Sequence, residues 1–131
     1  DNTLDCLSQA GIEYVADWVL DDQPVWLQAK PKPVLSVPYT VEINDIPMML
    51  LQHHRSEELL LRGIDQFERL WLEGEKIPRV MSISVHPYIT GVPHRIGYFE
   101  KLLDHIQSRA GVVIKTGEQI SNWYREQVPF K

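Results

Sequence analysis

The amino-acid sequence predicts an α/β fold, a partial (β/α) barrel of about four parallel strands with helices. Helical and strand-like segments follow the order helix, strand, strand, helix, strand, helix, strand, helix. Such alternation is typical of a parallel sheet with right-handed crossovers. Polar side chains also follow the first three expected strands directly. This placement is typical of the barrel face on which active sites are built.

The first third of the chain is expected to hold one helix and two strands. The helix spans residues 3–10, with Thr3 as a candidate N-cap and Gly11 as the residue that ends it. Apolar runs bounded by polar residues or proline predict strands over 12–16 and 34–38, and a short extended piece over 25–27.

The clearest helix is expected over residues 56–73. Its apolar residues recur at spacings of four, three and four, and they are Leu60, Ile64, Phe67 and Trp71. Ser56 is expected to cap this helix and Gly74 to end it. A glycine inside a helix costs about 1 kcal/mol relative to alanine, so Gly63 indicates close packing at its position.

The last third alternates strand and helix again. Strands are expected over 79–85 and 112–115, with a helix over 93–109 between them that stops at Gly111. Thr116 and Gln119 have the spacing of a capping box, which opens a last helix through Tyr124. Four strands cannot close a barrel and leave two apolar edges. We therefore expect a missing N-terminal portion or a second copy of the chain to complete the sheet.

Composition narrows the class of protein. The chain has 131 residues and is expected to form one domain over 1–131. Its net charge of −5 and its scattered Lys and Arg argue against nucleic-acid and membrane partners. Cys6 is the only cysteine and is expected to be buried, with no intrachain disulfide. The N-terminus lacks the basic and then apolar pattern of a secretory signal, so a cytoplasmic location is expected.

The strand over 79–85 ends abruptly on His86, and Pro87 stops it. An imidazole, whose ordinary pKa is about 6.5, can deliver a proton at neutral pH, so His86 is a candidate catalytic residue. The alternative is a histidine that only closes the strand with a backbone hydrogen bond. His94 and Arg95 could hold a substrate oxygen, or they could be solvated side chains at a helix start.

Two further polar groups follow the first two strands. The first is expected to form a pocket wall, with a solvated acidic loop as its alternative, and consists of Asp17, Trp18, Asp21 and Asp22. The second is expected to contact substrate, with Asx-type turn bonding as an equal alternative, and consists of Glu42, Asn44 and Asp45. The adjacent pair His53 and His54 is expected at the surface.

Four segments carry a family resemblance: YVADWVLDDQP, VPYTVEINDIP, PRVMSISVHPYITGVPHR and GVVIKTGEQISNWY. Together they resemble the C-terminal half of the polysaccharide deacetylase superfamily, and within it the branch that includes metal-independent allantoinases. The resemblance covers essentially the whole chain. It implies a distorted (β/α) barrel and hydrolysis of carbon–nitrogen bonds in non-peptide amides, typically N-acetyl groups on sugars.

The resemblance also implies roles for individual residues. The family's fourth motif contributes an Asp and a Trp that shape the pocket and tune it, and it corresponds to the stretch from Asp17 to Asp22. Which of the three carboxylates takes the motif's place is open. The fifth motif contributes the histidine that protonates the leaving amine, and it corresponds to His86. The 17–22 loop, with Asp17 as a second candidate catalytic residue, is then expected to orient His86.

The family's first three motifs supply a catalytic base, the zinc ligands and an arginine, and this chain contains none of them. No metal or cofactor is therefore expected from this chain, and His53 and His54 do not replace the ligands, because adjacent histidines cannot both face one metal. The expected function is hydrolysis of a small amide or N-acetyl sugar, by this chain or by the protein of which it is the C-terminal fragment. The alternative is a non-catalytic half-barrel that dimerises or needs a partner chain.

Overall fold

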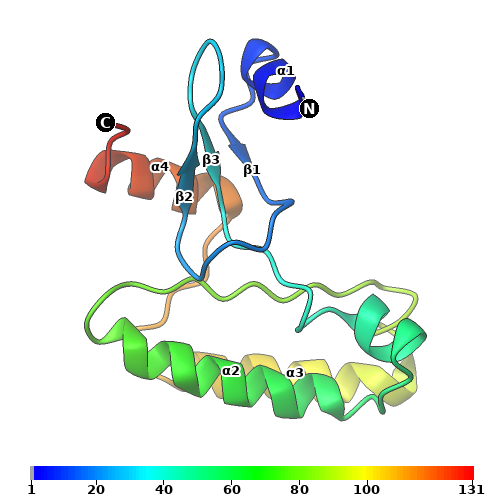
Figure 1. Cartoon of the computed structure of the whole chain (residues 1–131). Helices are drawn as coiled ribbons and strands as arrows, with labels where there is room; N and C mark the ends of the chain where they lie inside the picture. Colours follow the sequence, from blue (N-terminus) through cyan, green and yellow to red (C-terminus); the bar gives the residue numbers. More distant parts are fainter. Residues whose placement is uncertain (1) are drawn as a thin grey trace. The chain divides into compact units, whose positions relative to one another are not determined.

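The computed structural model describes residues 2–131, which form two compact units. The first unit contains residues 2–39 and Ile114–Lys131, and the second contains Thr40–Val113. The first holds a small sheet with helices and the second is mainly helical (Figure 1). The α/β class expected from the sequence is therefore confirmed.

The first unit is built on a three-stranded sheet with the order β1–β3–β2. Strands β1 (Tyr14–Val15) and β3 (Val34–Ser36) are parallel, as the sequence predicted for these two segments. Strand β2 (Val25–Leu27) pairs antiparallel with β3, so the expectation of a wholly parallel sheet was wrong. Only six residues join β2 to β3, and a parallel connection needs a crossover of a dozen or more.

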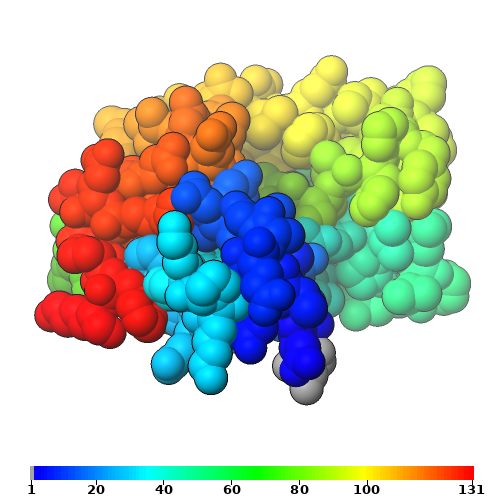
Figure 2. All heavy atoms as spheres, turned by 90° about the horizontal axis from the view of Figure 1, so that it is seen from above, coloured from blue at the N-terminus to red at the C-terminus, as the bar shows by residue number. Residues whose placement is uncertain are grey.

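Two helices complete the first unit, α1 (Thr3–Gln9) and α4 (Gly117–Gln127). The hydroxyl of Ser8 donates to the carbonyl of Lys32 at 2.6 Å and accepts from its N–H at 2.9 Å. These bonds hold the β2–β3 loop beside α1, where the two segments are neighbours in Figure 2. Leu4 and Leu7 pack against the core of this unit, whereas Cys6 lies on the other face of α1 and is exposed. The expectation of a buried cysteine was therefore wrong.

Helices α2 (Glu58–Gly74) and α3 (Pro93–Gln107) lie side by side in the second unit (Figure 1). A Cβ atom at position 63 would overlap the side chain of Leu102, so Gly63 allows the close approach that the sequence indicated. The N-cap of α2 is Glu57, without a side-chain cap. Ser56 therefore does not cap the helix as expected.

The capping box is present at the start of α4. Thr116 Oγ1 accepts from the Gln119 N–H at 3.2 Å, and the Gln119 side chain accepts from the Thr116 N–H at 3.0 Å. The strand expected just before it, over 112–115, is absent from the structure. Val113 and Ile114 are 73% and 70% exposed. They lack the neighbouring strand that would turn an apolar run into part of a sheet.

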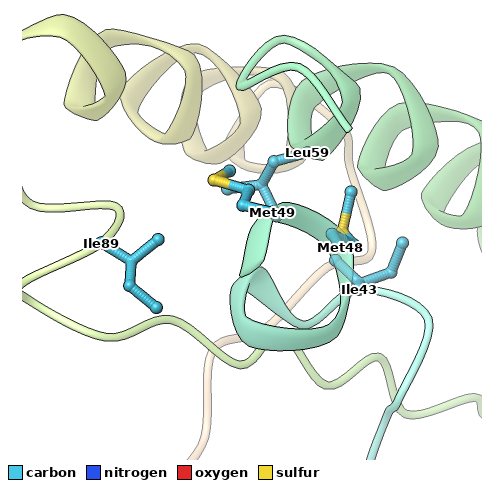
Figure 3. Close-up of a cluster of buried hydrophobic side chains, with 5 residues drawn as sticks. All are labelled: Ile43, Met48, Met49, Leu59 and Ile89. Carbon is cyan, nitrogen blue, oxygen red and sulfur yellow. The ribbon is translucent and has the colours of Figure 1, made fainter. Parts of the chain in front are cut away.

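A π-helical turn, η1 (Ile46–Leu51), was not expected from the sequence. Its Met48 and Met49 form a buried cluster with three side chains from separate segments, which Figure 3 labels as Ile43, Leu59 and Ile89. Ile89 belongs to the loop that follows His86. The core of the second unit therefore anchors that loop.

No helix within residues 2–131 is long and apolar enough to cross a bilayer.

Candidate active site

Two segments far apart in the sequence pair next to the candidate catalytic histidine. Asn44 and Ser84 form a parallel β-bridge. The Ser84 N–H donates to the carbonyl of Ile43 at 2.9 Å, and the Asp45 N–H donates to the carbonyl of Ser84 at 3.1 Å. The predicted strand over 79–85 is reduced to this single bridge. The two segments nevertheless run in the same direction, so Asp45 and His86, which follow the bridged residues, lie at the same end of the pair.

Asp45 is the carboxylate that holds His86. Its Oδ1 accepts from Nδ1 of the His86 ring at 2.7 Å. Its Oδ2 accepts from the His86 backbone N–H and from the Thr90 hydroxyl, both at 2.7 Å. Asp45 is completely buried. Both carboxylate oxygens are therefore occupied by donors from one loop.

The surroundings of Asp45 act on its pKa in opposite directions. Burial raises the pKa of the carboxyl, while hydrogen bonds from the His86 backbone, the Thr90 hydroxyl and the His86 ring lower it. The charge of His86 lowers it further, and the net pKa lies below the ordinary value of 3.8. Asp45 is therefore ionised at neutral pH. An ionised carboxylate only accepts hydrogen bonds, so Nδ1 of His86 carries the hydrogen.

The other nitrogen of His86 remains available. The His86 side chain is 36% exposed, and no group within residues 2–131 forms a hydrogen bond to Nε2. The ring of Tyr88 lies beside it, with the two centroids 5.7 Å apart. The imidazole is thus fixed on one side and open on the other, the arrangement required of a proton donor that must reach a substrate.

The loop after His86 is tightly wound. The His86 carbonyl accepts from the N–H groups of Ile89 and Thr90 at 3.0 and 2.9 Å. A Cβ at position 91 would overlap the carbonyl oxygen of Pro87, so the turn requires Gly91. Together with the buried Ile89 side chain, these contacts fix the backbone from which His86 projects.

The remaining polar residues of the second unit have varied contacts. Asn44 is buried and its Oδ1 accepts from the Ile46 N–H at 3.1 Å, which is the Asx-type bonding considered as an alternative for it. Glu42 is exposed, and its Oε2 lies 3.7 Å from Nη1 of Arg62. Arg95 donates from Nη1 to the Ile89 carbonyl at 3.2 Å, and its buried Nε has no hydrogen-bond partner among the described residues. His94 is exposed in the first turn of α3.

The acidic loop of the first unit has a different environment. Asp17, Asp21 and Asp22 are all exposed. Asp17 lines an open hollow of about 570 Å³ together with residues 11–16 and two residues of α4. Trp18 is half-buried and packs against the cluster of Val15, Ala29 and Val34.

Zinc, which the family resemblance implies, does not fit this stretch of chain. Residues 2–131 contain no group of three or more His, Cys, Asp or Glu arranged to hold a metal ion. His53 and His54 are exposed, as expected, and Nε2 of His54 lies 3.0 Å from Nη2 of Arg62.

Sequence reasoning missed the partner of His86. It assigned the orienting role to the 17–22 loop and substrate contact to Asp45, and it left Thr90 and Tyr88 out. The signal available was the position of Asp45 shortly after the apolar segment 34–38, as His86 follows the segment 79–85. Two parallel segments that end at one edge bring such residues together.

Comparison with known proteins gives two relatives with matching sequences. A Schizosaccharomyces pombe protein, provisionally named a polysaccharide deacetylase, is 36% identical over 85% of this chain. The peptidoglycan deacetylase of Helicobacter pylori is 29% identical over 92% of this chain. The chain spans only 38% and 35% of the lengths of these relatives. No family model matches it.

Two solved structures share the fold over 96% of this chain and 43% of their own chains. A probable polysaccharide deacetylase from Pseudomonas aeruginosa PAO1 has a TM-score of 0.88 and 29% identity. Puue allantoinase has a TM-score of 0.89 and 25% identity. The allantoinase-like branch is thus a structural neighbour. The homologues that cover most of this chain support its place in the polysaccharide deacetylase family, and the chain spans about two fifths of their lengths.

Proposed function

We propose that this chain is the C-terminal part of a polysaccharide-deacetylase-like (β/α) barrel that hydrolyses a non-peptide amide, with His86 as the proton donor. The observation that carries the proposal is the Asp45–His86 pair. Asp45 fixes Nδ1 of the imidazole through a 2.7 Å hydrogen bond, and Nε2 has no partner within residues 2–131. This is the geometry that general-acid catalysis requires.

The proton transfer follows from that geometry. A base takes one proton from water as the oxygen adds to the carbonyl carbon, and the carbon–nitrogen bond then breaks with its electron pair passing to nitrogen. Nε2 of the His86 imidazolium gives its proton to that nitrogen, so the products are a carboxylic acid and a free amine. Activation of the water is assigned to the motifs that the family resemblance places N-terminal to this stretch.

Asp45 takes the orienting role in this proposal. It holds the ring by Nδ1, and its negative charge stabilises the imidazolium before the proton leaves. Thr90 in turn fixes the carboxylate. From the sequence, Asp17 is proposed as a catalytic residue, and Trp18, Asp21, Asp22 and Glu42 as substrate-binding residues. His94 and Arg95, in the first turn of α3, are proposed to hold a substrate oxygen.

The test is release of acetate from N-acetylated sugars, and of ring-opened product from allantoin, by the whole protein. We expect one of the two substrates to be hydrolysed and His86→Gln to lower kcat by about 10²–10⁴-fold. His53→Asn is the matched control, because His53 is exposed and has φ 58°, which asparagine tolerates. Equal activity of His86→Gln and the wild-type protein would remove His86 from the mechanism.

The second candidate is a non-catalytic half-barrel that dimerises through its apolar edge. The exposed Val113 and Ile114 favour it, because exposed apolar residues in an extended segment are available for pairing with another strand. Light scattering tests this candidate. A dimer without hydrolytic activity would support it, and a stable monomer would contradict it.

A further inference from the structure

We propose that Tyr88 is a substrate-contacting residue whose ring forms a platform for a ring of the substrate beside His86. This inference rests on the proposed role of His86. Tyr88 is 66% exposed. Its ring centroid lies 5.7 Å from that of His86, with an angle of 60° between the two rings. A large aromatic ring is therefore presented to solvent next to the nitrogen that would donate the proton.

The backbone holds Tyr88 in this position. On one side of it, the His86 carbonyl accepts two backbone hydrogen bonds, and on the other, Ile89 and Thr90 are 1% and 2% exposed. Thr90 is also bonded to Asp45 at 2.7 Å. Tyr88 is thus an exposed residue of a turn that backbone hydrogen bonds and the buried Ile89 and Thr90 hold in place. Because the backbone is already held, contact with Tyr88 costs little backbone conformational entropy.

Isolated exposed aromatic residues are common, so exposure alone carries no role. The turn, however, couples Tyr88 to the site. The same few residues that hold His86 against Asp45 place the Tyr88 ring beside it. A displaced Tyr88 would require breaking contacts of the His86 loop. The backbone from which the Tyr88 ring projects is therefore held together with that of His86.

The chemistry of the platform selects cyclic substrates. An aromatic face packs well on the C–H face of a saturated sugar ring, and a tyrosine hydroxyl can add one hydrogen bond at its rim. An acylated nitrogen on the stacked ring would lie toward His86. A small acyclic amide could reach His86 but could not cover the Tyr88 ring at the same time. Tyr88 is thus expected to contribute to ring binding and little to the chemical step.

The experiment compares two probes in the whole protein, tetra-N-acetylchitotetraose and the acyclic N-acetylethanolamine. We expect Tyr88→Ala to raise KM for the sugar about tenfold, as loss of one aromatic contact would, with kcat within about threefold of wild type. Tyr88→Phe should stay near wild type, because the face is kept. Hydrolysis of N-acetylethanolamine should not change. Trp123→Ala is the control, since Trp123 is exposed on α4.

Binding by calorimetry in a His86→Ala background separates this inference from the proposed function. If the wild-type protein hydrolyses neither probe, but the sugar still binds and Tyr88→Ala weakens that binding about tenfold, the platform stands and the hydrolase proposal fails. If the sugar binds equally with and without the Tyr88 ring, or does not bind at all, the platform is overturned. An equal loss with both probes would also overturn it.

Discussion

Two acidic segments of this chain look alike in sequence and differ in structure. Asp45 and the group of Asp17, Asp21 and Asp22 each come shortly after an apolar segment. Asp45 is completely buried and receives three hydrogen bonds from one loop. The other three carboxylates are exposed, and Asp17 lines an open hollow. Position after a strand therefore does not decide what a carboxylate does.

The difference lies in the donors that surround each carboxylate. A buried carboxylate is tolerated only when hydrogen bonds compensate for lost hydration. The His86 loop supplies three such donors to Asp45, so burial here fixes an imidazole as well as a carboxylate. Asp17, Asp21 and Asp22 are exposed, so hydration compensates for much of their charge and their side chains can reach a ligand from solvent. We therefore expect substitutions at Asp45 and in the 17–22 loop to have different consequences.

The largest effect is expected from Asp45→Asn. Asparagine keeps the shape of the side chain but removes the negative charge that stabilises the imidazolium. In the whole protein, kcat should therefore fall about 10- to 100-fold, with little change in KM. Steady-state kinetics on the substrate that the wild-type protein hydrolyses measures this. Asp65→Asn, at an exposed carboxylate of α2, is the matched control. A kcat equal to wild type would show that Asp45 does not support the proton donor.

The next effect is expected on stability, from Thr90→Val. The substitution removes the hydroxyl that donates to Asp45 at 2.7 Å and leaves a buried charge with one donor fewer. The free energy of unfolding should fall by about 2 kcal/mol, as for loss of a hydrogen bond to a charged group. Urea denaturation measures it. Thr90→Ser should restore most of the loss, and if it is as unstable as Thr90→Val, the hydroxyl is not the cause.

A smaller effect is expected in the pH dependence of stability. The pKa of Asp45 is lower in the folded chain than its ordinary value of 3.8. Its contribution to stability is therefore complete above 3.8 and is lost as the pH falls through the folded pKa. The stability difference between wild type and Asp45→Asn should shrink on acidification below that value. A difference that stays constant in acid would contradict the lowered pKa.

The smallest effects are expected in the exposed loop. Asp21→Asn and Asp22→Asn should change the free energy of unfolding by less than about 0.5 kcal/mol, as exposed substitutions usually do. Asp17→Asn, at the hollow, should affect KM more than stability. Denaturation and kinetics on the same three variants test this. A stability loss as large as that of Thr90→Val would mean that the two acidic segments do not differ as described.

Helix positions were accessible from the sequence because local patterns encode them. The stripe through Phe67 predicted α2 to within a few residues, and the capping box at Thr116 predicted the start of α4. The strands were less accessible, because a strand exists only where a neighbour pairs with it. The 112–115 segment has strand composition without a partner strand in the structure.

The site was predictable only in part, for the same reason. His86 was singled out because an apolar run ends on it, which is a local signal. Its pairing with Asp45 depends on the register between segments 41 residues apart, which periodicity cannot give. The role of Thr90 depends in turn on that pairing. Long-range hydrogen bonds show which polar residue near the expected strands is the partner of His86. It is Asp45, one of six plausible candidates: Asp17, Asp21, Asp22, Glu42, Asn44 and Asp45.

The tautomer of His86 is the property that the Asp45 contact determines. Nitrogen-detected NMR of the ring at about pH 8.5, well above the ordinary imidazole pKa of about 6.5, distinguishes the two neutral forms. We expect the hydrogen on Nδ1, facing Asp45, and a bare Nε2, with this preference weakened in Asp45→Asn. A neutral ring that carries its hydrogen on Nε2 in the wild-type protein would contradict the account.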